Sequence, residues 1–326
     1  MDGTDGSDGS DGSDGKDSTD LMGASPHPLA PRILRLGAVT STQDEASRRL
    51  QQGTPAPFAV TARRQTSGRG RLGRPFESPE GASLSCTYVH RTALDPTRRG
   101  WIPLVAGLSA VRALTEVTGR LAPAQVGLKW PNDLHTPDGR KLGGILVEGR
   151  GAEHVLVGIG LNLRAPLSPA DGGVVPGAAW LRGEEGLCED DGPPAPPEDP
   201  STGEVLRESL ETALVTTLRE ELERLESVQG DAVRAGVRDR YTMTCLTLGR
   251  RVRIDPLGRR AGGGDPPRSW SGLAREIDEH GRLVVDLEGD GRRAVDVGDV
   301  RHLRPEATAG TPEDGASDIE QEEHVT

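Results

Sequence analysis

The segment Gly127–Gly149 reads GLKWPNDLHTPDGRKLGGILVEG and contains two of the three lysines in a chain of 326 residues. The other 36 basic residues are arginines. A lysine with only a general electrostatic role could have been arginine here, whereas a compact ammonium suits an anion in a confined space. Lys129 and Lys141 therefore predict chemistry on an anion. The alternative is that two of the chain's three lysines lie in this segment by chance.

Apolar and alternating runs around this segment predict an α/β domain over residues 31–240. Its expected strands are 58–62, 82–90, 144–147 and 155–163, and its expected helices are 41–50, 101–117 and 205–228. The first helix begins with a hydroxyl cap before acidic residues. The stretch 164–200 is rich in proline, glycine and acidic residues, so we expect a long surface loop.

From Leu246 onwards the pattern changes to short apolar runs separated by glycine turns: LGRRVRI, WSGLAREID, GRLVVDLEGD and RRAVDVGDVRHLR. Such runs predict a small β-barrel over residues 245–304. Residues 1–30 and 305–326 are expected to be disordered acidic tails, because they offer almost no apolar residues to bury.

Charge and cysteine content exclude several classes of protein. Residues 1–24 carry −6 and residues 305–326 carry −7, so the total of −12 leaves +1 for the part between them, which does not indicate global nucleic-acid binding. Three cysteines without CxxC spacing predict neither a disulfide framework nor a zinc site, and Cys86 and Cys245 are expected in the core. No apolar run is long enough to span a bilayer, and the N-terminus is acidic, so we expect a cytoplasmic protein without a membrane partner.

The loop Arg63–Phe76, RRQTSGRGRLGRPF, contains five arginines, and no acidic residue occurs from Thr54 to Phe76. Its three glycines allow the backbone to approach a ligand and to direct amides at it, which suits a phosphate chain. The Gly-Lys-Ser/Thr ending of a P-loop is absent. A nucleic-acid-binding RG segment and a solvated charged loop are the alternatives, although this loop lies between two predicted strands.

Four strings occur in order: GRGRLGRPF at 68–76, KWPND at 129–133, GRKLGGILVEG at 139–149 and VGIGLNL at 157–163. With them the chain, over about residues 35–304, resembles the biotin–protein ligases (biotin–[acetyl-CoA-carboxylase] ligases). The resemblance implies a mixed-sheet catalytic domain of α/β (α+β) class, similar to class II aminoacyl-tRNA synthetases, followed by an SH3-like barrel. It also implies the activity, in which biotin and ATP give biotinyl-5′-AMP and the biotinyl group then passes to a lysine of a biotin carboxyl carrier domain.

The resemblance implies roles for residues on both substrates. Residues implied in catalysis are Lys141, between the biotin carboxylate and the α-phosphate, with Arg71, Lys129 and Asp133. Residues implied in biotin binding are Ser41, Thr42, Gln43, Gln65, Gly68, Arg69, Arg71, Lys141 and Gly143, with Gln43 where the family has asparagine. Residues implied in ATP and adenylate binding are Arg69, Arg71, Arg74, Phe76, Asn132, Lys141 and Asn162. Magnesium is implied by the triphosphate, with no protein ligands assigned.

Three further expectations follow from this chemistry. A free lysine amine, with a pKa of about 10.4, is almost wholly protonated at pH 7, so a base is needed, and Asp133 is the candidate by position. The Arg63–Phe76 loop is expected to close over the adenylate and keep out water, with Arg71 holding the intermediate. The family usually has tryptophan where this chain has Phe76, so stacking on adenine would bury less area.

Two other functions remain as alternatives. A lipoate ligase would share the lysine chemistry but lacks the GRGRxGR loop, and a binding module with a basic loop would not need both lysines in one site. Residues 1–30 offer no helix-turn-helix, so no DNA-binding role is expected. The carrier protein, the choice between monomer and dimer, and a start at Met22 stay open.

Overall fold

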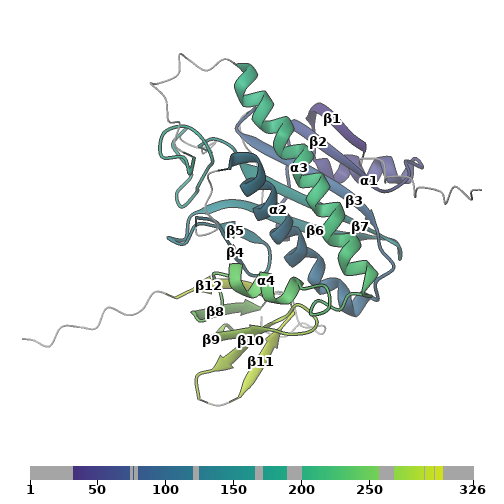
Figure 1. Cartoon of the computed structure of the whole chain (residues 1–326). Coiled ribbons are helices and arrows are strands. Elements are labelled where there is room, and N and C mark those ends of the chain that lie inside the picture. Colours follow the sequence, from purple (N-terminus) through teal and green to yellow (C-terminus); the bar gives the residue numbers. More distant parts are fainter. Residues whose placement is uncertain are drawn as a thin grey trace, which may run out of the picture. The chain divides into compact units, whose positions relative to one another are not determined.

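The computed structural model describes residues 32–73, 76, 80–119, 125–165, 172–188, 200–256, 268–289, 291–296 and 298–303 (Figure 1). The described residues, from 32 to 303, belong to one compact unit. The two tails predicted to be disordered, residues 1–30 and 305–326, lie outside the described residues.

A mixed seven-stranded sheet carries the candidate site. Its order is β1-β2-β3-β7-β6-β5-β4, and only the pair β1–β2 is parallel among the strand pairs of the described residues. The strands are β1 Arg32–Val39, β2 Phe58–Gln65, β3 Ser83–Arg91, β4 Gly127–Lys129, β5 Asp133–His135, β6 Lys141–Arg150 and β7 His154–Asn162. The chain therefore brings the GRK and VGIG strings onto neighbouring central strands.

Two long helices, α2 (Ile102–Thr118) and α3 (Pro200–Ser227), lie side by side across the sheet (Figure 1). They are joined across their contact by Thr217, whose Oγ1 donates to the Ser109 carbonyl at 3.0 Å. The remaining helices are α1 (Thr42–Gln51), α4 (Val237–Thr244) and the 3₁₀ turns η1 (Arg71–Gly73) and η2 (Pro96–Trp101).

Successive side chains of β3 point to opposite faces of the sheet and pack in different surroundings. Leu84, Cys86 and Tyr88 are buried in the large core that also contains the apolar faces of α2 and α3. Val89 belongs instead to a small second cluster with Ala46 of α1. Because successive side chains of a strand point to opposite faces, the hydroxyls of β3 lie on the α1 side. That face holds the polar cavity described below.

The C-terminal part forms a five-stranded antiparallel sheet, ordered β11-β10-β9-β8-β12, as expected for an SH3-like domain. Its strands are β8 Arg251–Pro256, β9 Trp270–Ile277, β10 Leu283–Leu287, β11 Arg292–Val295 and β12 Gly298–His302. Two buried tryptophans connect it to the part with the seven-stranded sheet: Trp101 Nε1 donates to the Glu279 carbonyl at 2.8 Å, and Trp130 Nε1 donates to the Gly281 carbonyl at 3.0 Å. The turn between β9 and β10 is thus fixed beside the KWPND segment.

The predicted helices and strands are confirmed, with ends shifted by a few residues, except that β6 and α3 are longer than expected. β1, the short strands β4 and β5, and α4 were not predicted. The prediction of a surface loop over 164–200 is wrong in part. Within the described stretch 172–188, Ala179 and Leu181 are fully buried, and Ala178 forms a bridge with Lys141.

Cysteine and membrane expectations can be compared with the structure directly. Cys86 and Cys245 are buried and free, as predicted, and Cys188 is buried as well. Among the described residues, no helix is both long enough and apolar enough to cross a membrane.

Candidate active site

A cavity of about 210 Å³ opens on the α1 side of the seven-stranded sheet. Its lining comes from the N-terminus of α1, the ends of β2 and β3, the glycine-arginine loop, β5, and the centres of β6 and β7. The lining residues are Ser41, Thr42, Gln43, Gln65, Arg69, Gly70, Arg71, Phe76, Ser85, Thr87, Asn132, Asp133, Lys141, Gly144, Ile145, Leu146, Gly158, Ile159 and Gly160. Ten of these were predicted as site residues from the sequence, so distant motifs do converge on one cavity.

Lys141 and Asp133 form the charged end of this cavity. Lys141 Nζ donates to Asp133 Oδ1 at 2.8 Å, and the lysine remains about half exposed. Burial alone would raise the pKa of Asp133, but His135 and the ammonium of Lys141 outweigh it and lower the pKa from 3.8 to about 2. His135 Nε2 stands 3.8 Å from Asp133 Oδ2, which is an ion-pair distance rather than a hydrogen bond. Asp133 is therefore a carboxylate at neutral pH.

Two arginines of the loop have defined partners. Arg71 Nη1 donates to Asn132 Oδ1 at 2.7 Å, and Asn132 Nδ2 donates to the Ile145 carbonyl at 3.0 Å. This chain of bonds ties the loop to β6 and aims one guanidinium at the cavity. Arg69 forms an ion pair with Asp44 of α1, at the outer side of the site.

Neutral hydrogen-bonding groups form the opposite end. Gln65 Oε1 accepts from Thr42 N at 2.8 Å and from Thr42 Oγ1 at 3.1 Å. Thr87 Oγ1 donates to Thr42 Oγ1 at 2.9 Å. Ser41 caps α1 by accepting from Gln43 N at 3.2 Å, and Gln43 Nε2 donates to Glu148 Oε2 at 3.2 Å. The N-terminus of α1 thus presents three adjacent polar residues to the cavity, each less than 5% exposed.

Glycines of β7 form the floor. A Cβ on Gly160 would lie 2.5 Å from Cζ of Phe76, and a Cβ on Gly158 would lie 3.0 Å from Gln43 Oε1. The absence of side chains at these two positions lets the Phe76 ring and the Gln43 amide lie directly on the strand. Gly160 pairs with Gly144 of β6, which lies beside Lys141 and Asp133, so the Phe76 ring lies between the charged end and Gln43. This position was not evident from the sequence.

Four predicted site residues do not line the cavity. Gly68 accepts from Phe76 N at 2.8 Å through its carbonyl, and a Cβ on Gly143 would lie 2.5 Å from the Gly160 carbonyl, so both allow close backbone packing. Asn162 Nδ2 donates to the carbonyls of Lys141, at 3.3 Å, and Ala179, at 3.0 Å. These bonds fix the backbone that carries Lys141.

Lys129 is the fourth, on β4 opposite Asp133. Its charge acts on His302 of β12: burial first, and then the positive charges of Lys129, Arg250 and His135, lower the pKa of that imidazole to about 4. Arg74, the remaining predicted phosphate ligand, lies outside the described residues.

The sequence interpretation missed lining residues of two kinds. Ser85 and Thr87 alternate with buried apolar residues in β3, and Gly158 and Gly160 alternate in β7. In both cases the signal in the sequence was a pair of similar residues two positions apart on one strand, which places them on the same face. It could not be used without the order of the strands, which decides which face lies over the cavity.

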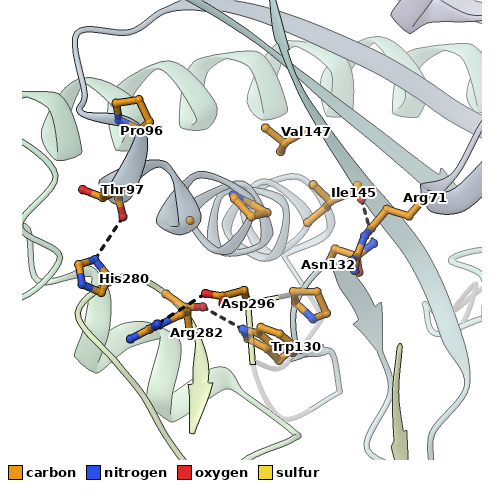
Figure 2. A pocket seen from close by; sticks show the side chains of 14 residues that line it. Arg71, Pro96, Thr97, Trp130, Asn132, Ile145, Val147, His280, Arg282 and Asp296 are labelled. Atoms are coloured by element: carbon orange, nitrogen blue, oxygen red, sulfur yellow. Dashed lines mark hydrogen bonds and ion pairs between the residues drawn. The ribbon is translucent and has the colours of Figure 1, made fainter. Parts of the chain in front are cut away.

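A second cavity of about 510 Å³ adjoins the first and shares Arg71, Asn132 and Ile145 with it. Figure 2 shows Arg71 and Asn132 at one end and His280 and Arg282, from the β9–β10 turn, at the other. Both sheets therefore contribute to the surroundings of the charged end.

The described residues contain no group of three or more histidine, cysteine or acidic side chains that could hold a metal ion. Asp133 is the single carboxylate among the lining residues above, and it is already paired with Lys141. The described part of the chain offers Mg²⁺ no cage of its own.

Comparison with known proteins gives one consistent result. The model of the Biotin/lipoate A/B protein ligase family matches residues 36–162. A biotin–[acetyl-CoA-carboxylase] ligase of Mycobacterium tuberculosis is 33% identical over 75% of this chain and 79% of its own length.

Solved structures agree with this match. A biotin protein ligase from Leishmania major in complex with biotinyl-5-AMP is 25% identical, with a TM-score of 0.50, covering 81% of this chain and 98% of that one. The fold is also that of a biotin protein ligase from Aquifex aeolicus, at a TM-score of 0.61 and 24% identity, covering 83% of this chain and 99% of that one.

Proposed function

This chain belongs to the Biotin/lipoate A/B protein ligase family, and we propose that it is an ATP-dependent biotin–protein ligase. It joins biotin to ATP as biotinyl-5′-AMP with release of pyrophosphate. It then transfers the biotinyl group to the side-chain amine of a lysine on a biotin carboxyl carrier domain and releases AMP.

One observation carries this proposal: a single cavity has a cationic end and a neutral amide-and-hydroxyl end. Biotin has the matching polarity, with a carboxylate at one end and a ureido ring at the other. Ligand sites of this kind use a few placed polar groups to fix orientation. The carboxylate would lie towards Lys141 and Arg71, and the ureido ring towards Thr42 and Gln65.

In the first step, a carboxylate oxygen attacks the α-phosphorus and the bond to the pyrophosphate oxygen breaks. Two anions must meet, so fixed positive charges and hydrogen-bond donors at that point should dominate the rate. Lys141 supplies an ammonium that reaches both partners. Arg71 supplies a guanidinium held by Asn132, at the place where the two cavities meet.

Magnesium enters as part of the nucleotide substrate. Since the described residues offer it no cage, we assign it no protein ligand and no step. ATP brings the metal on its phosphate oxygens, as is usual when Mg²⁺ is bound mainly by substrate.

In the second step, the acceptor amine attacks the acyl carbon, the bond from the acyl carbon to the phosphate oxygen breaks to release AMP, and the amine loses its proton to solvent. The sequence suggested Asp133 as the base. A carboxylate with a pKa of about 2 has little affinity for a proton, so we propose that Asp133 acts as an acceptor that holds Lys141 in place. We propose that Arg71 retains the adenylate. The variant Arg71→Gly should release biotinyl-5′-AMP, which would then react with lysines of other proteins.

We also propose a protein acceptor for the biotinyl group and a location for the enzyme. The Mycobacterium tuberculosis relative acts, by its name, on acetyl-CoA carboxylase, and we propose a biotin carboxyl carrier domain of such an enzyme as the partner here. A cytoplasmic location is proposed because the reaction consumes ATP. No nucleic-acid or membrane partner is proposed.

The deciding experiment is biotin-dependent exchange of labelled pyrophosphate into ATP, measured with biotin and with lipoate. Wild type should exchange with biotin and not with lipoate, and Lys141→Ala should abolish the exchange. Lys16→Ala is the matched control, because it removes the same group far along the sequence, and it should behave as wild type. Exchange with lipoate alone would make the protein a lipoate ligase, and no exchange with either acid would favour a binding module.

A further inference from the structure

The amide of Gln43 is bound on one side only. Gln43 is 3% exposed and lines the first cavity. Its Nε2 donates to Glu148 Oε2 at 3.2 Å. Its Oε1 is buried and has no hydrogen-bond partner within the part of the chain that the structure describes. A buried carbonyl left without a donor costs free energy, so this atom is an unfilled acceptor.

Glu148 determines which way the amide faces. A carboxylate accepts hydrogen bonds and cannot donate them, so it must meet the NH₂ group of Gln43. Glu148 is itself held, because Arg150 Nη2 donates to the same oxygen at 3.0 Å and Arg150 Nε donates to Ser47 Oγ at 3.0 Å. Turning the amide over would place two acceptors against each other.

The free carbonyl points onto the floor of the cavity. A Cβ on Gly158 would lie 3.0 Å from Oε1 and 3.2 Å from Cδ of Gln43. On the same face of β7, Gly160 lies under the Phe76 ring. The unfilled acceptor therefore belongs to the neutral end and lies over the β7 backbone at Gly158, next to the position of the Phe76 ring.

We propose that Glu148 is a positioning residue for biotin recognition, which sets the Gln43 amide so that Oε1 accepts a hydrogen bond from a ureido N–H. This inference rests on the proposed function. It makes the site selective for a ring that donates at that point. A cyclic carbamate, in which a ring oxygen replaces the N–H, would meet acceptor against acceptor and bind poorly.

The test compares biotin with its two cyclic carbamate analogues, each with oxygen in place of one ureido N–H, in pyrophosphate exchange. Wild type should disfavour one analogue by about tenfold or more in kcat/KM, as expected for one lost hydrogen bond plus repulsion. In Glu148→Gln, the new side chain accepts or donates equally well, so the Gln43 amide can turn. About half of the molecules would then still present the Gln43 carbonyl, so the KM for biotin should rise only about twofold. The kcat and the KM for ATP should not change.

The preference for biotin over the carbamate shows whether Glu148 positions the Gln43 amide or only supports the structure around it. In Glu148→Gln the preference for biotin over the disfavoured carbamate should fall several-fold. Glu153→Gln is the matched control, since it neutralises an exposed carboxylate that pairs with Arg91 at 3.1 Å. It should retain wild-type KM and discrimination.

Gln43→Met provides a second route to the same answer, in case Glu148→Gln does not fold. It should show the same loss of discrimination, and adding Glu148→Gln to it should change nothing further. A wild type that exchanges with biotin, together with variants of unchanged discrimination, overturns this inference and leaves the proposed function standing. A wild type without biotin-dependent exchange overturns the proposed function itself.

Discussion

The two ends of the cavity are built differently. At the charged end, Lys141 forms an ion pair with Asp133 at 2.8 Å, and Arg71 donates a charge-assisted hydrogen bond to Asn132 at 2.7 Å. At the neutral end, Thr42, Gln65 and Thr87 share hydrogen bonds of 2.8–3.1 Å among uncharged groups. The charged end suits a step in which charge builds up, and the neutral end suits recognition of a group that does not react. Substitutions at the first should change kcat, and substitutions at the second should change KM.

The two lysines of the motif segment allow the largest test of this division. Lys141 lines the cavity and Lys129 does not. We expect Lys141→Ala to lower pyrophosphate exchange by roughly a hundredfold to a thousandfold, as removal of a donor to developing charge does elsewhere. Lys129→Ala should cost less than about tenfold, and it should raise the pKa of His302, which can be followed by NMR titration. An equal loss of exchange in both variants would show that Lys129 also acts at the reacting centre, as the sequence resemblance implied.

Asp133 gives the next largest effect, this time on stability. Its pKa falls from 3.8 to about 2 on folding, so the folded protein is stabilised above pH 4 and loses this contribution as the pH falls towards 2. The shift corresponds to about 2 kcal/mol. Asp133→Asn should therefore lower the free energy of unfolding in urea by about that amount at pH 7 and by about half as much at pH 3. A difference that does not vary with pH would show that the ion pair with Lys141 is not its source.

The charged end could be predicted from the sequence and the neutral end only in part. Lys141, Asn132 and Asp133 lie within one short segment whose turn brings them together, and their spacing carries the information. Thr87 faces the cavity, and Glu148 reaches Gln43, only because β3 and β6 both flank β7 in antiparallel register. Strand order cannot be read from local periodicity, since a shift of one residue reverses every side chain.

The elements missed in the fold have similar causes. β1, RILRLGAV, has no clear alternation and is an edge strand whose exposed residues resemble those of a loop. Ala179 and Leu181 lie in a stretch whose composition is otherwise that of a surface loop, yet that stretch pairs with the backbone of Lys141.

Gln65 tests the neutral end, with an intermediate effect. Gln65→Met removes the acceptor for both the amide and the hydroxyl of Thr42 while keeping a similar volume. Two neutral hydrogen bonds are lost, so the KM for biotin should rise roughly tenfold, with little change in kcat. Gln51→Met, at the exposed end of α1, is the control and should behave as wild type. A fall in kcat with constant KM would mean that the neutral end also acts in the chemical step.

Gly160 gives the smallest effect and decides what Phe76 contacts. In Gly160→Ala the new methyl would lie 2.5 Å from the Phe76 ring, so the ring must move away from β7. If the ring covers the biotin bicycle, the KM for biotin should rise roughly fivefold and the KM for ATP should stay constant. Gly149→Ala on β6, where a Cβ has no atom within 4 Å, is the matched control.

The complementary change sharpens this last comparison. Phe76→Leu should relieve the close contact in Gly160→Ala. The KM for biotin of the double variant should therefore be no higher than that of either single variant. A rise in the KM for ATP instead would support the stacking on adenine that the sequence resemblance implied, and would assign Phe76 to the charged end. A kinetic experiment therefore decides the end to which Phe76 belongs, because its ring lies over Gly160, between Gly158 beside Gln43 and Gly144 beside the charged end.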